Sequence, residues 1–300
     1  MIDVRHTVKL ADDFEERKQN SLKELLKNKD IYMFIQQNHI SYETYSDYWS
    51  ELLSFEEDHH LCRDCQSIEQ CPKTAVGMQY HLDYDGEILL STRPCQYGEQ
   101  YQHNQRILSH YLFNNMSDEY AFIKLMDLDI MERASTLSAN TAATLMKVLS
   151  YVQKKSNKGL YVSGHTGSGK TTILCGLLNS LAEQGYDVGI CRFPQFLFDL
   201  KAGFNSDSNT ADMSELMTIP YLLIDGLGEE NITTWSRDEV LSTIINYRDM
   251  NHLPTFISSI YSLDELKKLY TLRKKDPVES LKTTAIIEKI KNMCDELMID

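Results

Sequence analysis

The chain has 300 residues, which is enough for two domains with a sizeable core in at least one. Its formal net charge of −14 argues against broad, non-specific binding to duplex DNA, which needs many lysines and arginines to neutralise phosphates. No apolar run approaches the ~20 residues that span a bilayer, and the charged N-terminal segment lacks the apolar centre of a secretory signal. We therefore expect a cytoplasmic protein whose seven cysteines are free thiols or metal ligands rather than disulfides.

The chain changes character near residue 100. Residues 1–57 are rich in Glu, Lys, Leu and Tyr and are compatible with helices. The segment 98–115 is polar and rich in Tyr, Gln and Asn, so it marks a boundary. We expect a small, mostly helical N-terminal domain over residues 1–100, a linker over 101–116 and a larger domain over 117–300.

A block of cysteines in the first part of the chain suggests a metal site. Its possible ligands are Cys62, Cys65, Cys71, His81 and Cys95, with His59 and His60 just before them. A structural Zn²⁺ takes four ligands tetrahedrally, and a Cys-x-x-Cys turn commonly supplies two of them. Closely spaced thiolates repel one another unless a cation neutralises them, so the folding of this block should depend on the metal.

Five main candidates for four places leave one residue outside the zinc site. We expect Cys62, His81 and Cys95 to be ligands, and Cys65 and Cys71 compete for the fourth place. Gly86 predicts a hairpin that brings Cys95 back toward the Cys-x-x-Cys turn. The alternative interpretation is a set of incidental free cysteines.

The octamer from Gly164 to Thr171 matches the phosphate-binding pattern G-x-x-x-x-G-K-[ST] without a mismatch. In such loops the glycines let backbone N–H groups point inward around phosphate oxygens, and the next helix offers its positive N-terminal end. Lys170 is expected at the β- and γ-phosphates, and the Thr171 hydroxyl at Mg²⁺. The predicted nucleotide-binding residues are Gly164, His165, Thr166, Gly167, Ser168, Gly169, Lys170, Thr171 and Thr172.

After residue 116, short apolar runs alternate with helical patterns. Residues 160–162, 187–191, 221–225 and 255–259 are predicted strands. The predicted helices are residues 172–184, residues 235–250, a segment that begins at Pro194, and a segment that begins at the capping box of Ser262. This alternation predicts an α/β fold in which helices cover both faces of a parallel sheet. Ligands of such folds bind at the carboxyl ends of the strands, where the octamer lies.

Asp225 ends a hydrophobic strand and is the predicted second protein ligand of Mg²⁺. The alternative role is a strand-end aspartate that caps a turn. Many phosphate-loop ATPases place a second acid directly after this aspartate, but here the next residue is Gly226. Glu229 is the candidate that orients the attacking water in its place, provided that its loop folds back.

Taken together, these motifs resemble the AAA+ ATPase domain of bacterial replicative-helicase loaders of the DnaI type. The most specific segments are KGLYVSGHTGSGKTTIL from Lys158, WSRDEV from Trp235, HLPTFISS from His252 and IIEKIK from Ile286. The resemblance implies an AAA+ phosphate-loop domain that uses ATP and Mg²⁺, and it extends more weakly into the first ~100 residues. In that family this part is a zinc-containing domain that binds the hexameric replicative DNA helicase.

The resemblance also implies local contacts with single-stranded DNA and self-assembly on the helicase. Lys201 and Phe204 are candidates for the contact with DNA. Arg237 and Arg248 are candidates for a charge offered to a neighbouring subunit's nucleotide.

The chain departs from the family at three nucleotide-sensing positions, namely Gly226, Ile260 and Lys289. Two functions therefore stay open. The first is an ATP-dependent helicase loader, and the second is an ATP-binding adaptor or inhibitor of the helicase with little hydrolysis of its own. A small-molecule kinase would need a lid with several arginines, whereas residues 185–254 contain only Arg192, Arg237 and Arg248.

Overall fold

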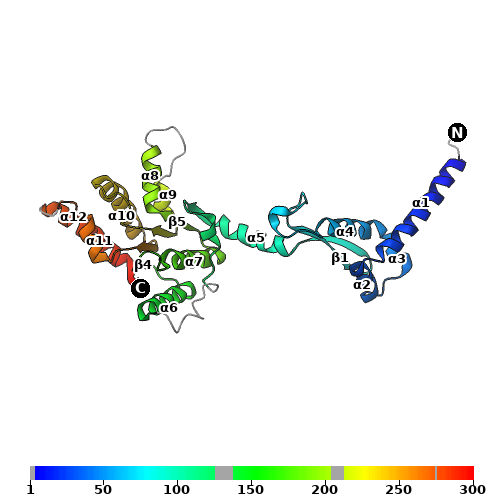
Figure 1. Ribbon diagram of the computed structural model, residues 1–300, viewed down its shortest axis with the longest axis horizontal. Helices are drawn as coiled ribbons and strands as arrows, with labels where there is room; N and C mark the ends of the chain where they lie inside the picture. The colour runs from blue at the N-terminus through cyan, green and yellow to red at the C-terminus, as the bar shows by residue number, and fades with distance from the viewer. Residues whose placement is uncertain (1–3, 126–137, 204–212, 274–275) are drawn as a thin grey trace. The chain divides into compact units, whose positions relative to one another are not determined.

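The computed structural model divides into two compact units, Met1–His103 and Asn104–Asp300 (Figure 1). The residues that it describes are 4–125, 138–203, 213–273 and 276–300. None of the helices in these ranges combines the length and apolar character needed to cross a membrane.

In the first unit, helices precede a β-hairpin. Its elements are α1 (Val4–Leu25), α2 (Lys29–Gln37), α3 (Tyr42–Asp47), α4 (Trp49–Leu61), the 3₁₀ turn η1 (Ile68–Gln70), β1 (Met78–Tyr84) and β2 (Ile88–Pro94). The division between the units falls within α5 (Gln96–Ser109).

Local sequence signals explain where these elements begin and turn. The Asn28 side chain accepts a hydrogen bond from the backbone N–H of Asp30 at 2.9 Å and caps α2. Gly86, with φ of +81°, lies in the turn that joins β1 to β2 in antiparallel pairing. The predicted hairpin is thereby confirmed. One core joins the helices to the hairpin, and its buried residues are Leu22, Leu25, Ile31, Ile35, Ile40, Leu52, Phe55 and Ile88.

The second unit alternates strands and helices, as predicted. Its strands are β3 (Tyr111–Asn114), β4 (Gly159–Gly164), β5 (Val188–Arg192), β6 (Tyr221–Asp225), β7 (Thr255–Ser259) and β8 (Cys294–Ile299). Its helices are η2 (Asp118–Phe122), α6 (Ala139–Gln153), α7 (Lys170–Glu183), α8 (Phe193–Gly203), α9 (Met213–Thr218), η3 (Trp235–Leu241), α10 (Ser242–Met250), α11 (Leu263–Tyr270) and α12 (Pro277–Met293).

The six strands form one parallel sheet in the order β3-β5-β6-β7-β4-β8. Successive residues of a strand point to opposite faces, so each strand feeds two cores. In β4, Leu160 and Val162 join a core with α6 and α7, whereas Tyr161 joins the core formed with α8 to α12. The predicted sheet with helices on both faces is confirmed (Figure 1).

Two details differ from the expectations. The segment 235–250 is helical, but its first part, η3, is a π-helix. The predicted linker contains the end of α5 and the strand β3, which pairs with β5 at the edge of the sheet. This strand has only four residues and lies within the polar segment 98–115, so its short apolar run did not stand out in the sequence.

Candidate functional site

The phosphate-binding loop connects the buried strand β4 to α7. Gly169 has φ of +91° and precedes the first residue of α7, so the turn uses a left-handed conformation that favours glycine. The Lys170 ammonium donates hydrogen bonds to the carbonyl oxygens of Gly164 and His165, at 2.9 and 2.7 Å. Burial lowers the pKa of Lys170, while the charges of Glu229 and Asp225 oppose this shift.

Thr171 and Asp225 meet at the carboxyl edge of the sheet. The Thr171 hydroxyl donates a hydrogen bond to Oδ1 of Asp225 at 2.7 Å, and the Ser258 hydroxyl donates to the same oxygen at 2.5 Å. The backbone N–H of Gly226 donates to Ser258 Oγ at 3.0 Å. Asp225 is 1% exposed, so β6 and its neighbours hold the carboxylate in one position. A hydroxyl beside a carboxylate fits the oxygen preference of Mg²⁺ in phosphate-loop proteins.

Arg192, at the end of β5, contacts both acidic residues of the site. Its Nη1 donates to Asp225 Oδ2 at 2.7 Å, and its Nη2 donates to Glu229 Oε2 at 2.5 Å. Burial favours a lower pKa for Arg192, but the hydrogen bonds and charges of the two carboxylates outweigh it, so the pKa is raised. The loop after β6 therefore folds back, as a role for Glu229 requires.

A cavity of about 320 Å³ joins these groups. It is lined by Met116, Tyr120, Thr166, Gly167, Lys170, Thr171, Arg192, Asp225, Glu229, Ser258 and Ile260. Met116, Tyr120 and Arg192 had no predicted role. No motif in the sequence indicates Arg192; the fold brings it to the site, because β5 and β6 are parallel neighbours and Arg192 is paired with Asp225 in their register.

The structure contradicts the two arginines proposed for a neighbouring subunit's nucleotide. Arg237 is 1% exposed and donates hydrogen bonds to Glu279 at 2.7 Å and to Asp238 at 2.5 Å. Arg248 is 0% exposed and donates to backbone carbonyls such as that of Ile219 at 2.6 Å. Both side chains are structural, because their guanidinium groups are buried and already paired.

The candidates for a contact with DNA are only partly described. The Lys201 ammonium lies 5.1 Å from the centre of the Trp235 ring. Phe204 lies outside the described residues.

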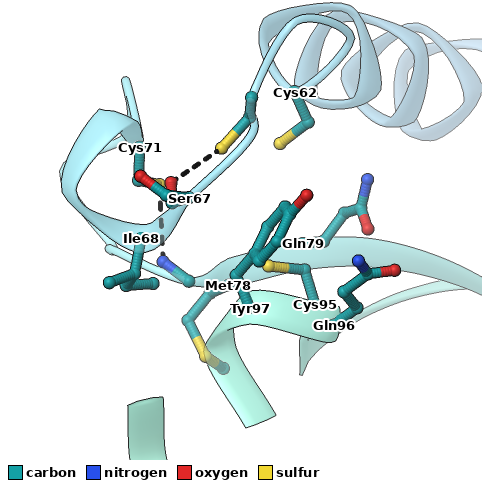
Figure 2. Close-up of a pocket in the computed structure, with 11 residues that line it drawn as sticks. Cys62, Ser67, Ile68, Cys71, Met78, Gln79, Cys95, Gln96 and Tyr97 are labelled. Atoms are coloured by element: carbon teal, nitrogen blue, oxygen red, sulfur yellow. Dashed lines mark hydrogen bonds between the residues drawn. The ribbon is translucent and has the colours of Figure 1, made fainter. Parts of the chain in front are cut away.

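In the first unit, all four cysteines of the predicted zinc block line one pocket of about 250 Å³. Figure 2 shows Cys62 at the end of a helix, Cys71 on the opposite loop and Cys95 after the hairpin, around the same space. Backbone N–H groups donate to two of the sulfurs, from Gly77 to Cys71 at 3.4 Å and from Gly98 to Cys95 at 3.4 Å. N–H···S hydrogen bonds of this kind stabilise thiolates and support metal ligands.

His81 does not line this pocket. It lies further along β1, opposite Ser91 of the hairpin. The four cysteines thus line one pocket, and the histidine lies outside its lining. As the side chains are placed, no group of three or more His, Cys, Asp or Glu residues in the described ranges is close enough to hold a metal ion.

The remaining cysteines, Cys175, Cys191 and Cys294, are buried in the second unit, as expected for core residues. Burial raises the pKa of the Cys294 thiol to about 12, so this side chain stays neutral.

Comparisons with known proteins identify the family of the second unit. The model of the family described as IstB-like ATP binding protein matches residues 97–300. The replicative helicase loader DnaI of Bacillus subtilis (strain 168) is 27% identical over 293 residues, which cover 96% of this chain and 93% of the relative.

Solved structures show the same fold. A crystal structure of DnaI matches with a TM-score of 0.54 and 26% identity, covering 65% of this chain and 97% of that one. A putative primosome component from Streptococcus pyogenes serotype M3 matches with a TM-score of 0.53 and 24% identity, covering 65% of this chain and 95% of that one. Because the model of the IstB-like ATP binding protein family matches residues 97–300, more than half of the chain, the chain belongs to that family.

Proposed function

We propose that this protein is an ATP-dependent loader of the replicative DNA helicase. The observation that carries the proposal is the similarity to a replicative helicase loader over 96% of the chain, because it includes the cysteine-containing first unit as well as the nucleotide site. A phosphate loop alone is shared by proteins of many functions.

The residues of the cavity divide the work on the nucleotide. The loop from Gly164 to Thr171 surrounds the phosphates, and Lys170 supplies a positive charge to them. Thr171 and Asp225 would hold Mg²⁺, which neutralises phosphate charge when it is bound. Ser258 positions Asp225 through its 2.5 Å hydrogen bond. Glu229 orients the attacking water once its carboxylate is free of Arg192.

In the first unit, Cys62, Cys65, Cys71 and Cys95 are the proposed zinc ligands. The shared pocket and the N–H groups that donate to Cys71 and Cys95 support this set. Four thiolates satisfy the tetrahedral preference of structural Zn²⁺ without a histidine. The proposed zinc domain, residues 1–100, binds the hexameric helicase, while residues 117–300 respond to ATP.

ATP acts on the loader through conformational coupling. Contacts with the γ-phosphate favour one arrangement of the ring-bound loader, and loss of that phosphate releases it. Local contacts with single-stranded DNA and self-assembly on the helicase belong to the same proposal. We expect both to occur on the helicase rather than on duplex DNA, because the chain carries a net charge of −14.

A pull-down with the replicative helicase of the same organism tests the proposal. The full chain and Lys170→Ala should both retain the helicase, whereas Cys95→Ser should lose it together with zinc. Failure of the unmodified chain to retain the helicase would refute the proposal that the helicase is its partner. Loss of helicase binding in Lys170→Ala would contradict the division of roles between the two units.

The second candidate function is an ATP-binding adaptor that scarcely hydrolyses ATP. Gly226 in place of an acid, and the engagement of Glu229 by Arg192, favour it. ATP turnover measured with helicase and single-stranded DNA separates the two functions. Turnover that Lys170→Ala abolishes would refute the adaptor, and its lack in the unmodified protein would refute the loader that hydrolyses ATP.

A further inference from the structure

One guanidinium group engages both carboxylates that the proposed function requires. Oδ1 of Asp225 accepts from Thr171 and Ser258, whereas Oδ2 accepts from Arg192. The second arm of the same guanidinium reaches Glu229. Arg192 lines the cavity, and its side chain is 35% exposed beside a carboxylate that is 1% exposed. It is thus a positive charge placed at the predicted magnesium ligand.

The backbone around Arg192 is built to hold it there. Its N–H donates to Asn115 Oδ1 at 2.7 Å, and the Asn115 amide donates back to the Arg192 carbonyl at 3.2 Å. This pair of hydrogen bonds ties the end of β5 to the chain just after β3. The direction in which the side chain leaves the strand is therefore restricted.

Gly226 makes the contact between Arg192 and Asp225 possible. A Cβ at position 226 would lie 2.1 Å from Nη1 of Arg192 and 2.7 Å from its Cζ. Gly226 also has φ of +74°, a conformation that side chains with a Cβ rarely adopt. The residue that replaces the usual second acid is thus the one residue type that leaves room for the guanidinium.

Magnesium and a guanidinium group compete for the same oxygens. Both are cations, and their mutual repulsion is strong at a buried carboxylate, where water screens charges poorly. Arg192 Nη1 lies 2.7 Å from Asp225 Oδ2 and already donates a hydrogen bond to it. A displaced guanidinium still lies on the wall of the cavity, where a phosphate oxygen is its natural partner.

We propose that Arg192 is an internal cation that competes with magnesium for Asp225 and must leave this carboxylate, releasing Glu229, before the site can act on ATP. The inference rests on the proposed nucleotide site. It makes Arg192 a positioning residue, because it acts through Asp225 and Glu229. It also explains why glycine stands at position 226 instead of a water-orienting acid: glycine leaves room for the guanidinium of Arg192.

The test is the magnesium dependence of nucleotide binding. A fluorescent ATP analogue is titrated into the full chain at a series of Mg²⁺ concentrations, and the Mg²⁺ concentration for half-maximal binding is recorded. Arg192→Met removes the charge but keeps the aliphatic stem, and it should lower that concentration by about tenfold. Arg106→Met, which removes an exposed arginine outside the cavity lining, is the matched control and should leave it unchanged.

Gly226→Ala is the second variant, because its Cβ would displace the guanidinium of Arg192 without removing any charge from the chain. It should shift the magnesium dependence in the same direction as Arg192→Met. Equal Mg²⁺ concentrations for the unmodified protein and both variants would overturn the role of Arg192 and leave the nucleotide site intact. No binding of the analogue to any of the proteins would overturn the nucleotide site itself.

Discussion

The hydroxyl of Thr171 and the carboxylate of Asp225 are 54 residues apart in the chain and 2.7 Å apart in the fold. The parallel sheet causes this meeting, because the loop and helix that follow β4 and the last residue of β6 lie at the same carboxyl edge. The contact places the two expected magnesium ligands side by side. It connects the phosphate loop to the strand that ends in Asp225.

Substitution of Lys170 tests the nucleotide site. Lys170→Ala removes the ammonium that lies among the carbonyls of Gly164 and His165. Charge-assisted contacts with phosphate are lost, so ATP should bind about a hundredfold more weakly or worse. Isothermal titration calorimetry checks this value. Lys147→Ala, which removes a surface lysine paired with Asp295, is the control; an equal loss in both variants would contradict a specific role for Lys170.

The zinc ligands are tested by a pair of substitutions in the first unit. Cys95→Ser should lower the bound zinc substantially and unfold this unit, because a structural zinc site supplies folding free energy. His81→Ala should keep the zinc, because His81 does not line the pocket of the four cysteines. Metal analysis by mass spectrometry and circular dichroism of the full chain provide the readouts. Zinc lost from His81→Ala but kept by Cys95→Ser would refute the four-cysteine set.

The ion pairs of the buried Arg237 side chain should make the stability of the second unit depend on pH. The hydrogen bond from Arg237 lowers the pKa of Asp238 below its usual 3.8 and that of Glu279 below its usual 4.5. A carboxyl whose pKa is lower in the folded state stabilises the protein above its unfolded-state pKa, and this contribution disappears as the pH falls through the folded-state value.

Arg237→Met should therefore lower the melting temperature by several degrees at pH 7, and the difference from the unmodified protein should shrink below about pH 4. Thermal melts at a series of pH values measure this difference. A deficit that stays constant down to pH 3 would show that Arg237 acts through packing rather than through its carboxylate partners.

Much of the second unit could be predicted from the sequence. The apolar runs at 221–225 and 255–259 match β6 and β7 residue for residue, because central strands of a parallel sheet are buried on both faces. The capping box of Ser262 and Glu265 also forms as expected. Such signals lie within short stretches of the sequence, so they can be recognised without knowledge of the fold.

The sequence does not show contacts between residues that are distant in the chain. Arg237 and Arg248 look like surface arginines in the sequence, but their partners come from helices and loops that only the fold brings together. His81 counts as a metal ligand by its residue type, yet the hairpin register puts it beside Ser91. Arg192 lacks a motif, and its role depends on the backbone conformation of Gly226.

The most direct test of the proposed function is a loading assay. The replicative helicase of the same organism is mixed with circular single-stranded DNA carrying a labelled complementary strand, and release of that strand is followed with and without this protein. We predict that the unmodified protein with ATP accelerates release and that Lys170→Ala does not. Release that is unchanged or inhibited by the unmodified protein, or equally fast with Lys170→Ala, would contradict an ATP-dependent loader.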